Sequence, residues 1–153
     1  LHTLARLAER HATWLRPYQP VAIVRQLART LRRELDFRRE RRSLARFRST
    51  FAGERTVHFP RVHDALSTRD VLTMEFLRGV SLRERERLAA TGADLGALAR
   101  RGAALWLDMI FRDGVYHADP HPGNLLRLDG DVLGVLDCGM VARLDPRLRD
   151  DVE

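Results

Sequence analysis

The sequence predicts a domain of the α+β class, and three observations lead to that prediction. Apolar residues recur every three or four positions over residues 1–16, 24–35 and 94–112, which is typical of helices. Residues 57–62 and 69–77 are rich in β-branched and aromatic residues, as strands are. A hairpin pattern with an Asp-Gly turn at residues 129–130 follows the last helix.

Two helices are predicted in the N-terminal third. Leu4, Leu7, Ala8 and Leu15 share one side of a helix over residues 1–16, and prolines at positions 17 and 20 then interrupt it. A long helix is expected next, because four apolar residues recur at spacings of three and four: Val24, Leu27, Leu31 and Leu35. Its second half is much more polar.

The middle of the chain is predicted to hold a loop at residues 51–60 and short strands after it. Residues 71–77 have the composition of a buried strand, which Arg78 and Gly79 end. Ser81 and Glu84 have the spacing of a capping box, which would begin a short helix.

Residues 94–112 give the clearest helical pattern, with one apolar stripe made of Leu95, Leu98, Gly102, Leu105 and Met109. The hairpin that follows has strands at residues 125–128 and 132–136. Asn124 comes just before its first strand and Asp137 just after its second, so we expect the two to lie close in space.

The octapeptide His117-Ala118-Asp119-Pro120-His121-Pro122-Gly123-Asn124, followed by Asp137-Cys138-Gly139, is the most informative part of the chain. Phosphoryl transfer needs a carboxylate to orient the attacking hydroxyl and hard oxygen ligands for the magnesium ions on the phosphates. Asp119 fits the first role, and Asn124 with Asp137 fits the second. The prolines and glycine of the octapeptide prevent a helix and let the loop turn back.

Two other interpretations of this segment stay open. Asp-Pro, His-Pro and Pro-Gly are ordinary turn dipeptides, so the loop could be purely structural. His117, Asp119 and His121 could instead bind zinc or iron in a hydrolase. The four-residue spacing of the histidines normally serves a metal from a helix face, which the prolines exclude.

Composition sets limits on the function. The 153 residues suffice for one domain, 44% are hydrophobic and 31% charged, and the net charge of +6 is carried wholly by arginine. The arginine runs are mixed with acidic residues and lack interleaved aromatics, which disfavours nucleic-acid binding and leaves a membrane-surface contact as an alternative. Cys138 is the single cysteine, and neither a signal peptide nor a transmembrane span is evident. We therefore expect a cytoplasmic protein, with a peripheral site at the inner membrane as a further expectation.

Four segments together resemble the UbiB (AarF-like, ABC1-like) family of atypical protein-kinase-like proteins. They are ELDFRRERRSLARFR, VLTMEFLRGVSL, HADPHPGNLL and VLDCGMVARL, in that order along the chain. The resemblance extends from about residue 27 to the C-terminus. It implies an incomplete protein-kinase-like fold in a single partial domain, with residues 1–77 from the N-lobe and 78–153 from the C-lobe.

The resemblance also assigns roles to residues and implies ATP and Mg²⁺ as cofactors. Asp119 matches the catalytic-loop aspartate, with Asn124 and Asp137 as the metal ligands. Glu34 and Asp36 match a Glu-x-Asp motif on a helix beside the ATP site. In kinases a helix glutamate pairs with a strand lysine, and Glu34 is the candidate for a related role. The alternative is that Glu34 is one more charge on a polar helix face. Met74 and Glu75 match the hinge that meets adenine. His117, His121, Gly123 and Gly139 support these loops.

The chain also departs from the family. Cys138 stands where the family normally has Phe, and the chain contains no lysine, although a kinase-like site uses a strand lysine to hold phosphates. The family's N-terminal Lys-x-Gly-Gln motif is therefore missing as well. We expect the chain to be a piece of a longer protein that is inactive alone.

Three functions follow for the parent protein. The first is a UbiB-type, Mg-ATP-dependent kinase or ATPase that supports ubiquinone (isoprenoid quinone) biosynthesis or lipid homeostasis, with a membrane surface, lipids or quinone-biosynthesis proteins as partners. The second is a small-molecule phosphotransferase similar to aminoglycoside or choline kinases, whereas the third is a non-catalytic regulatory pseudokinase.

Overall fold

The computed structural model describes residues 1–145, without the side chains of residues 13, 16 and 32–34. The chain divides into two compact units, Leu1–Asp36 and Phe37–Glu153, which are described here one at a time. Residues 146–153, which the predicted C-lobe part includes, lie outside the described residues. The predicted division into lobes at residue 77 stays a prediction.

Unit 1 is a pair of helices joined by a short 3₁₀ turn. Helix α1 (His2–His11) is followed by η1 (Thr13–Tyr18), which contains a proline, and by α2 (Pro20–Glu34). The predicted first helix is confirmed but ends earlier than expected. Ala5 is the one buried hydrophobic residue among the described side chains of this unit.

The long helix predicted after residue 20 is in fact two helices, because α2 ends at Glu34 and α3 (Arg38–Thr50) begins four residues later. The main-chain N–H of Phe37 donates to Arg69 O at 2.9 Å. That N–H is therefore used for a contact with a distant loop and cannot continue the hydrogen-bond ladder of α2.

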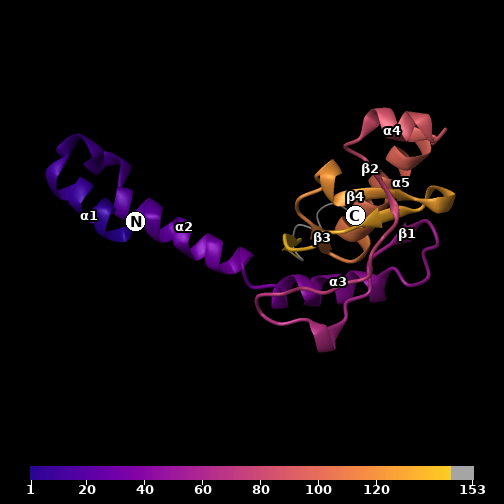
Figure 1. Cartoon of the computed structure of the whole chain (residues 1–153), viewed down its shortest axis with the longest axis horizontal. Helices are drawn as coiled ribbons and strands as arrows, with labels where there is room; N and C mark the ends of the chain where they lie inside the picture. The colour runs from indigo at the N-terminus through magenta and orange to yellow at the C-terminus, as the bar shows by residue number, and fades with distance from the viewer. Residues whose placement is uncertain (146–153) are drawn as a thin grey trace. The chain divides into compact units, whose positions relative to one another are not determined.

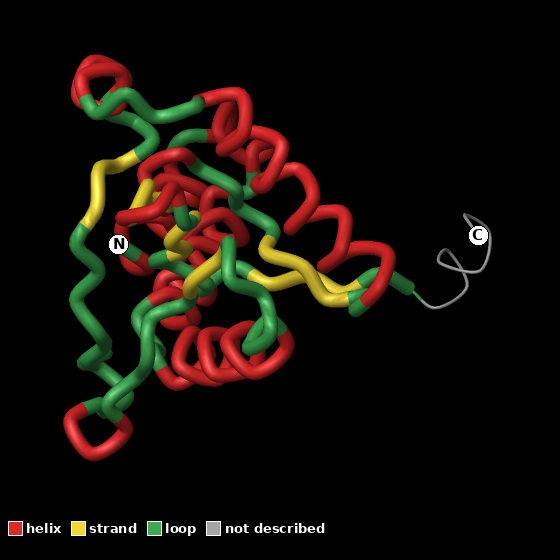
Figure 2. Tube along the Cα trace, turned by 90° about the vertical axis from the view of Figure 1, so that its right-hand side faces the viewer, coloured by secondary structure: helices red, strands yellow, loops and turns green. Residues whose placement is uncertain are grey.

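Unit 2 is built on two small sheets (Figure 1). The larger sheet has the order β1 (Val57–His58), β5 (Leu133–Val135), β4 (Leu125–Leu128), β2 (Gly79–Ser81), and only its β1–β5 pair is parallel. Strands β3 (Val115–His117) and β6 (Val141–Arg143) form an antiparallel pair. Figure 2 shows how short the strands are compared with the helices and loops.

The strand predicted over residues 69–77 is wrong. Only an isolated bridge between Val62 and Met74 forms there, and Val71 and Phe76 are 53% and 84% exposed. The side chain of Ser67 bonds to the main chain of both His63 and Thr73, at 2.9 and 3.0 Å. These bonds, on either side of the 3₁₀ turn η2 (Asp64–Leu66), hold the segment in a tight loop.

The predicted capping box is also wrong. Ser81 is the last residue of β2, opposite Leu126, and helix α4 (Arg85–Ala90) begins after Glu84 without a side-chain cap. The hydroxyl of Ser81 accepts instead from Arg83 N at 3.3 Å. Ser81 therefore pairs in the sheet and does not cap the helix to which the sequence pattern assigned it.

The predicted helix over residues 94–112 is confirmed as α5 (Leu95–Leu107), which continues in the π-helical turn η3 (Asp108–Arg112). Asp94 caps it by accepting from Ala97 N at 2.9 Å. The predicted stripe faces the core, except that Leu95 is 44% exposed at the first turn.

The core of unit 2 lies between α3, α5 and the larger sheet. Phe59 stacks on Phe47 and Phe51, with ring centroids 5.6 and 5.8 Å apart. Several side chains of this core have almost no exposed surface: Leu44, Phe47, Met109, Leu133, Val135 and Cys138. Within residues 1–145, no helix is both long and apolar enough to span a membrane.

Candidate functional site

The β4–β5 hairpin brings Asn124 and Asp137 to the same end of the sheet. Leu125 pairs with Val135, and one residue further out Leu136 N donates to Asn124 O at 2.9 Å. Asp137 is the next residue along. The turn η5 (Asp129–Asp131) closes the other end, as the predicted Asp-Gly turn required.

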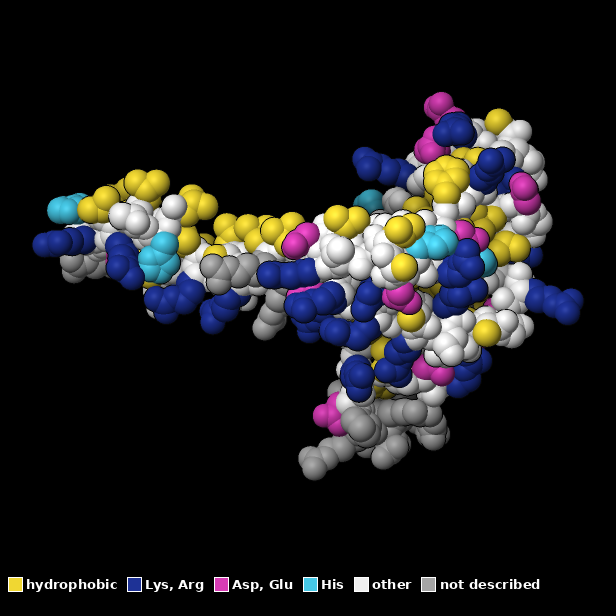
Figure 3. Space-filling model, turned by 60° about the horizontal axis from the view of Figure 1, so that its bottom comes forward, with side chains coloured by type: hydrophobic (Ala, Val, Ile, Leu, Met, Phe, Trp, Pro, Cys, Tyr) yellow, Lys and Arg dark blue, Asp and Glu magenta, His cyan; other side chains and the backbone are white. Residues whose placement is uncertain are grey.

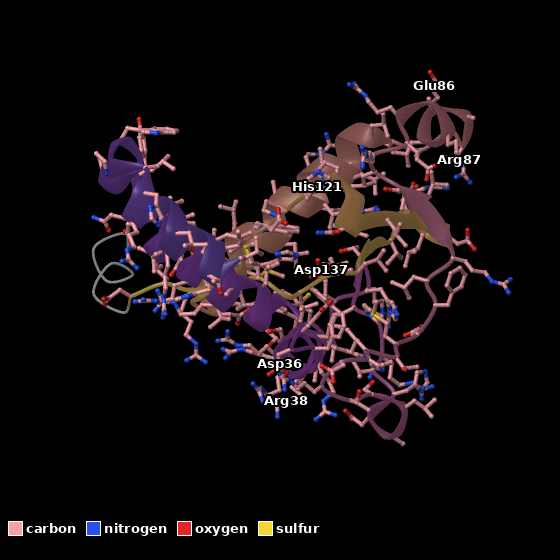
Figure 4. All side chains as sticks on the ribbon, turned by 60° about the vertical axis from the view of Figure 1, so that its left-hand side comes forward. Asp36, Arg38, Glu86, Arg87, His121 and Asp137 are labelled. Carbon is pink, nitrogen blue, oxygen red and sulfur yellow. The ribbon has the colours of Figure 1, made fainter. Side chains whose placement is uncertain are left out.

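The pairing of β3 with β6 brings the proline-rich loop to the same place. His117 ends β3 opposite Val141, and Ala118 N donates to Met140 O at 2.9 Å. Because β6 follows directly after the Asp137 turn, Asp119 emerges beside residues 137–140. Three segments that are separate in the sequence therefore meet, and Figure 4 shows Asp137 well inside unit 2, whereas Glu86 lies at its edge.

The buried side chain of His117 contacts the proline-rich loop, and its main chain contacts α5. Its side chain is 1% exposed, and its Nδ1 accepts from Asp119 N at 3.0 Å. Trp106 of α5 donates from Nε1 to His117 O at 3.0 Å, and the two rings are 5.7 Å apart. Since Nδ1 is an acceptor, the neutral imidazole carries its proton on Nε2, which has no hydrogen-bond partner among the described residues.

Burial lowers the pKa of His117 below its ordinary value of 6.5. The main chain of Asp137 and the carboxylates of Asp137 and Asp119 act in the opposite direction and are weaker. The buried imidazole of His117 is thus close enough to both carboxylates of the predicted site for their charges to act on its pKa.

The loop between Asp119 and Asn124 is held by its own hydrogen bonds. His121 N donates to Asp119 O at 2.8 Å, and Asn124 N donates to His121 O at 2.9 Å. The Nδ1 of His121 accepts from Gly123 N at 3.0 Å in the 3₁₀ turn η4 (Pro122–Asn124). A Cβ on Gly123 would lie 2.9 Å from that Nδ1, so only glycine fits without displacing the ring.

Asp137 is half-buried and fixed by the turn that follows it. Its Oδ1 accepts from Gly139 N at 2.7 Å, and its second oxygen makes no hydrogen bond to the described residues. Burial is the main cause that raises the pKa of the Cys138 thiol, with Asp137 and Glu40 adding to it. Cys138 is thus a small, protonated core residue close enough to both carboxylates for their charges to act on it.

Glu40 of α3 belongs to the site, and sequence reasoning missed it. Its Oε2 lies 3.8 Å from the position that a Cβ on Gly139 would take, and it acts on Cys138 electrostatically. Glu40 precedes the buried Leu44 by four residues and Phe47 by seven, which places it on the core-facing side of α3. That periodicity was the signal that could have identified it.

The predicted Glu-x-Asp motif belongs to unit 1, whereas this site belongs to unit 2. Glu34 ends α2 and Asp36 ends unit 1, and the side chain of Glu34 lies outside the described part of the chain. Their role beside the ATP site stays a prediction.

The two predicted hinge residues differ in what their main chains do. Glu75 N donates to Arg61 O at 2.8 Å, and the Glu75 carboxylate accepts from Arg61 N at 3.0 Å and lies 3.2 Å from His58 Nε2. The hydrogen bond from Arg61 is the main cause that lowers the pKa of Glu75, with burial opposing it. The N–H and C=O of Met74 and the C=O of Glu75 make no main-chain hydrogen bond to the described residues, so these are the hinge groups that could meet adenine.

The donor set at the hairpin end fits a hard cation. An amide oxygen from Asn124 and the Asp137 carboxylate oxygen that makes no hydrogen bond to the described residues are ligands that Mg²⁺ accepts, and nucleotide phosphates and water usually complete its shell. Within residues 1–145, no group of three or more His, Cys, Asp and Glu side chains is arranged to hold a metal. The alternative zinc or iron site is disfavoured because the Nδ1 atoms of His117 and His121 both accept main-chain N–H groups.

Two pockets lie near these elements. An apolar pocket of about 310 Å³ sits behind the loop between α5 and the sheet, lined by Pro120, Trp106 and Leu133 among others. A larger pocket of about 510 Å³ lies between the end of α3 and the segment after β1, and no predicted site residue lines it.

The sequence model of the family described as "ABC1 atypical kinase-like domain" matches residues 1–153. The "Probable protein kinase UbiB" of Aliivibrio fischeri strain MJ11 is 32% identical over 149 residues, which are 95% of this chain and 27% of that protein. The same-named protein of Azotobacter vinelandii is 34% identical over 154 residues, 98% of this chain and 29% of that protein. This chain therefore spans little more than a quarter of the length of these relatives.

A solved structure is similar over most of the chain. It is Rv3197 of Mycobacterium tuberculosis in complex with erythromycin, with a TM-score of 0.65 and 28% sequence identity. The match covers 80% of this chain and 30% of that one.

Proposed function

The chain belongs to the ABC1 atypical kinase-like family and has an incomplete protein-kinase-like fold of the α+β class, and from that premise we propose that its parent protein is a UbiB-type, Mg-ATP-dependent kinase or ATPase. The transfer would take the γ-phosphoryl group of ATP to an acceptor hydroxyl or to water. The curated relatives carry the UbiB name, which supports a role in isoprenoid quinone biosynthesis or lipid homeostasis.

One observation carries the proposal. The hairpin and the β3–β6 pair bring the main chains of Asp119, Asn124 and Asp137 to the same end of unit 2, and the buried His117 is close enough to both carboxylates for their charges to act on its pKa. A structural turn would need the prolines and glycine. It would not need a half-buried carboxylate that has one oxygen without a hydrogen bond to the described residues and lies one residue beyond the main-chain partner of Asn124.

Each side chain has a separate task in this proposal. Bound Mg²⁺ would neutralise charge on the phosphates, with Asn124 and Asp137 as its protein ligands. Asp119 is exposed at the loop surface, where it can accept a hydrogen bond from the attacking hydroxyl or water and orient it. His117 holds the main chain of Asp119 in place through Nδ1, as a positioning residue.

The chain does not supply every group that this chemistry uses. It contains no lysine, so in the proposed mechanism a lysine from another part of the parent protein holds the phosphates. Glu40, beside the Asp137–Gly139 turn, is our candidate for the helix carboxylate that such a lysine pairs with. Glu34 and Asp36 remain candidates for further contacts at the nucleotide.

The test is ATP hydrolysis by the purified parent-length protein, with and without Mg²⁺. Removing a metal ligand should reduce kcat by about 100-fold or more, so Asp137→Asn is the informative variant. Asp129→Asn is the matched control, because Asp129 lies in the exposed turn at the other end of the same hairpin.

The outcomes separate the three functions. Hydrolysis that needs Mg²⁺, is lost in Asp137→Asn and is kept in Asp129→Asn supports the proposal. No hydrolysis in the parent protein, together with no nucleotide binding, would favour the regulatory pseudokinase. Hydrolysis that responds to a small hydroxylated substrate but not to quinone precursors or lipid would favour the small-molecule phosphotransferase.

A further inference from the structure

The pocket of about 510 Å³ in unit 2 opens beside the C-terminal end of α3, and no residue of the candidate site lines it. Four residues supply large apolar side chains to its lining: Phe51, Val57, Phe59 and Val62. The rings of Phe51 and Phe59 stack, with centroids 5.8 Å apart. The volume lies within the roughly 300 to 1,000 Å³ that is typical of ligand sites, so the pocket can take a large side chain of a partner.

Two cationic groups at this pocket are available to a ligand. The lining includes Arg48 and Arg61, both exposed, whose guanidinium groups make no hydrogen bond or ion pair with the described residues. The two carboxylates of the lining are engaged. Glu54 Oε1 accepts from the N–H and the hydroxyl of Thr56, at 3.0 and 2.7 Å, and Asp64 Oδ1 lies 3.5 Å from an arginine Nε of α3. An anionic ligand can therefore pair with both arginines without breaking a contact.

The surface around the pocket is strongly basic. Residues 37–62, which include α3, contain eight arginines and two glutamates, so they carry a formal charge of +6, as much as the whole chain. Figure 3 shows arginine side chains gathered on the side of unit 2 where Figure 1 places α3. Between residues 37 and 65, all of which the structure describes, no large hydrophobic side chain is exposed. This surface therefore suits an anionic partner, but it lacks the apolar side chains that enter a lipid bilayer.

The apolar lining narrows the choice among anionic partners. Nucleic-acid sites stack bases on exposed aromatic rings, whereas Phe51 and Phe59 are 6% and 2% exposed. A nucleic acid would use the arginines and leave the apolar lining without a partner. A peptide that has carboxylates beside one aromatic side chain uses both features, because the ring fills the pocket and the carboxylates pair with the arginines.

We propose that this pocket and the arginines around it form a docking site for an acidic peptide segment of a partner protein. The segment inserts one aromatic side chain into the pocket, and its carboxylates pair with Arg48 and Arg61. Because Glu40 also lies on α3, the bound segment contacts the helix that carries a residue of the candidate site. The docking itself does not depend on the proposed phosphoryl transfer.

The experiment is a fluorescence anisotropy titration of the parent-length protein and of the 153-residue chain, without ATP or Mg²⁺. The probe is a labelled synthetic peptide with one phenylalanine between two runs of glutamate. One control peptide has alanine in place of the phenylalanine, and another has lysine in place of every glutamate. We expect both proteins to bind the probe, to bind the alanine peptide at least about tenfold more weakly, and not to bind the lysine peptide. Affinity for the probe should fall as salt is raised.

Two variants test the pocket itself. Arg48→Gln with Arg61→Gln should weaken binding of the probe by about tenfold, because each exposed ion pair contributes roughly threefold. Ala45→Trp adds a large ring at the lining of the pocket, where it takes room that the phenylalanine needs. This variant should weaken binding by at least about tenfold.

Matched controls lie on and beside α4, which lines no part of this pocket. Arg83→Gln with Arg85→Gln removes two exposed charges, and Ala89→Trp adds a ring at an exposed helical position. Both controls should leave the affinity within about twofold of that of the unsubstituted protein. Circular dichroism of every variant checks that the helices are kept.

Several results would overturn the proposal. One is no binding of the probe, and another is equal affinity for the phenylalanine and alanine peptides, because the pocket would then take no side chain. Losses of equal size in the pocket variants and the controls would remove the pocket from the account. Binding by the 153-residue chain but not by the parent-length protein would mean that the rest of the parent fills the pocket. Tighter binding of single-stranded RNA or of anionic vesicles that Ala45→Trp leaves unchanged would assign the basic surface to that partner instead.

Discussion

Replacing His117 tests whether this buried ring orients the predicted catalytic aspartate. His117→Phe keeps a ring beside Trp106 but removes the Nδ1 that accepts from Asp119 N at 3.0 Å. His117→Asn keeps an acceptor near that position and removes most of the ring. The pair therefore separates the hydrogen bond from the packing.

The structure gives the expected size of both effects. Losing one hydrogen bond costs about 1 kcal/mol, and placing a larger ring in a site that is 1% exposed adds roughly 1 kcal/mol of strain. Losing ring contacts in the Asn variant costs about 1 to 2 kcal/mol. Both variants should therefore lose about 2 kcal/mol of unfolding free energy, measured by urea titration.

The assay uses the 153-residue chain with Trp14→Phe, which leaves Trp106 as the single tryptophan and as a reporter of unit 2. Amide hydrogen exchange then reads the hydrogen bond directly. Asp119 N–H should exchange at least about tenfold faster in His117→Phe than in His117→Asn. Equal exchange rates at Asp119 in the two variants would refute the reasoning.

Three further predictions concern the same region. The free energy of unfolding should fall as the pH drops below 6.5, because the unfolded chain then binds a proton at His117 while burial keeps the pKa of the folded state lower. Urea titrations at several pH values should show a smaller fall for His117→Asn. Gly123→Ala should cost about 1 kcal/mol, because its Cβ would lie 2.9 Å from His121 Nδ1, and an unchanged urea midpoint would contradict this contact. Leu133→Ala, in a residue with no exposed surface, should cost about 3 kcal/mol, whereas Leu107→Ala, in a residue that is 54% exposed, should cost below about 0.5 kcal/mol; equal losses would mean that Leu133 is not in the core.

Elements that depend on local periodicity could be predicted from the sequence. The helix around residues 95–109 repeats its apolar residues at helical spacing, and its Asp94 cap is local too. The hairpin was predictable because its Asp-Gly turn fixes which strand residues face each other. That register is also why Asn124 and Asp137 could be expected close together.

Elements that depend on distant contacts could not be predicted in this way. Residues 71–77 have strand composition, but the side chain of Ser67 folds the neighbouring main chain into a loop. Ser81 has a helix-capping pattern, yet pairing with β4 takes it into a strand. The division of one expected helix near Phe37 follows from a hydrogen bond to Arg69, more than thirty residues away.

The candidate site shows the same limit. Asp119, Asn124 and Asp137 are recognisable from their residue types and spacing, because the loop chemistry is local. The link through His117 depends on the pairing of β3 with β6, and the placement of Glu40 depends on how α3 packs. Neither follows from the motif alone.

The central claim is that Asn124 and Asp137 hold the metal of a bound nucleotide. Electron paramagnetic resonance can measure the affinity of the parent-length protein for Mn²⁺ in the presence of a non-hydrolysable ATP analogue, because Mn²⁺ accepts the same oxygen ligands. The account predicts that Asp137→Asn weakens Mn²⁺ binding by about tenfold or more, whereas Asp129→Asn leaves it unchanged. Equal Mn²⁺ affinity in Asp137→Asn and the unsubstituted protein would contradict the claim.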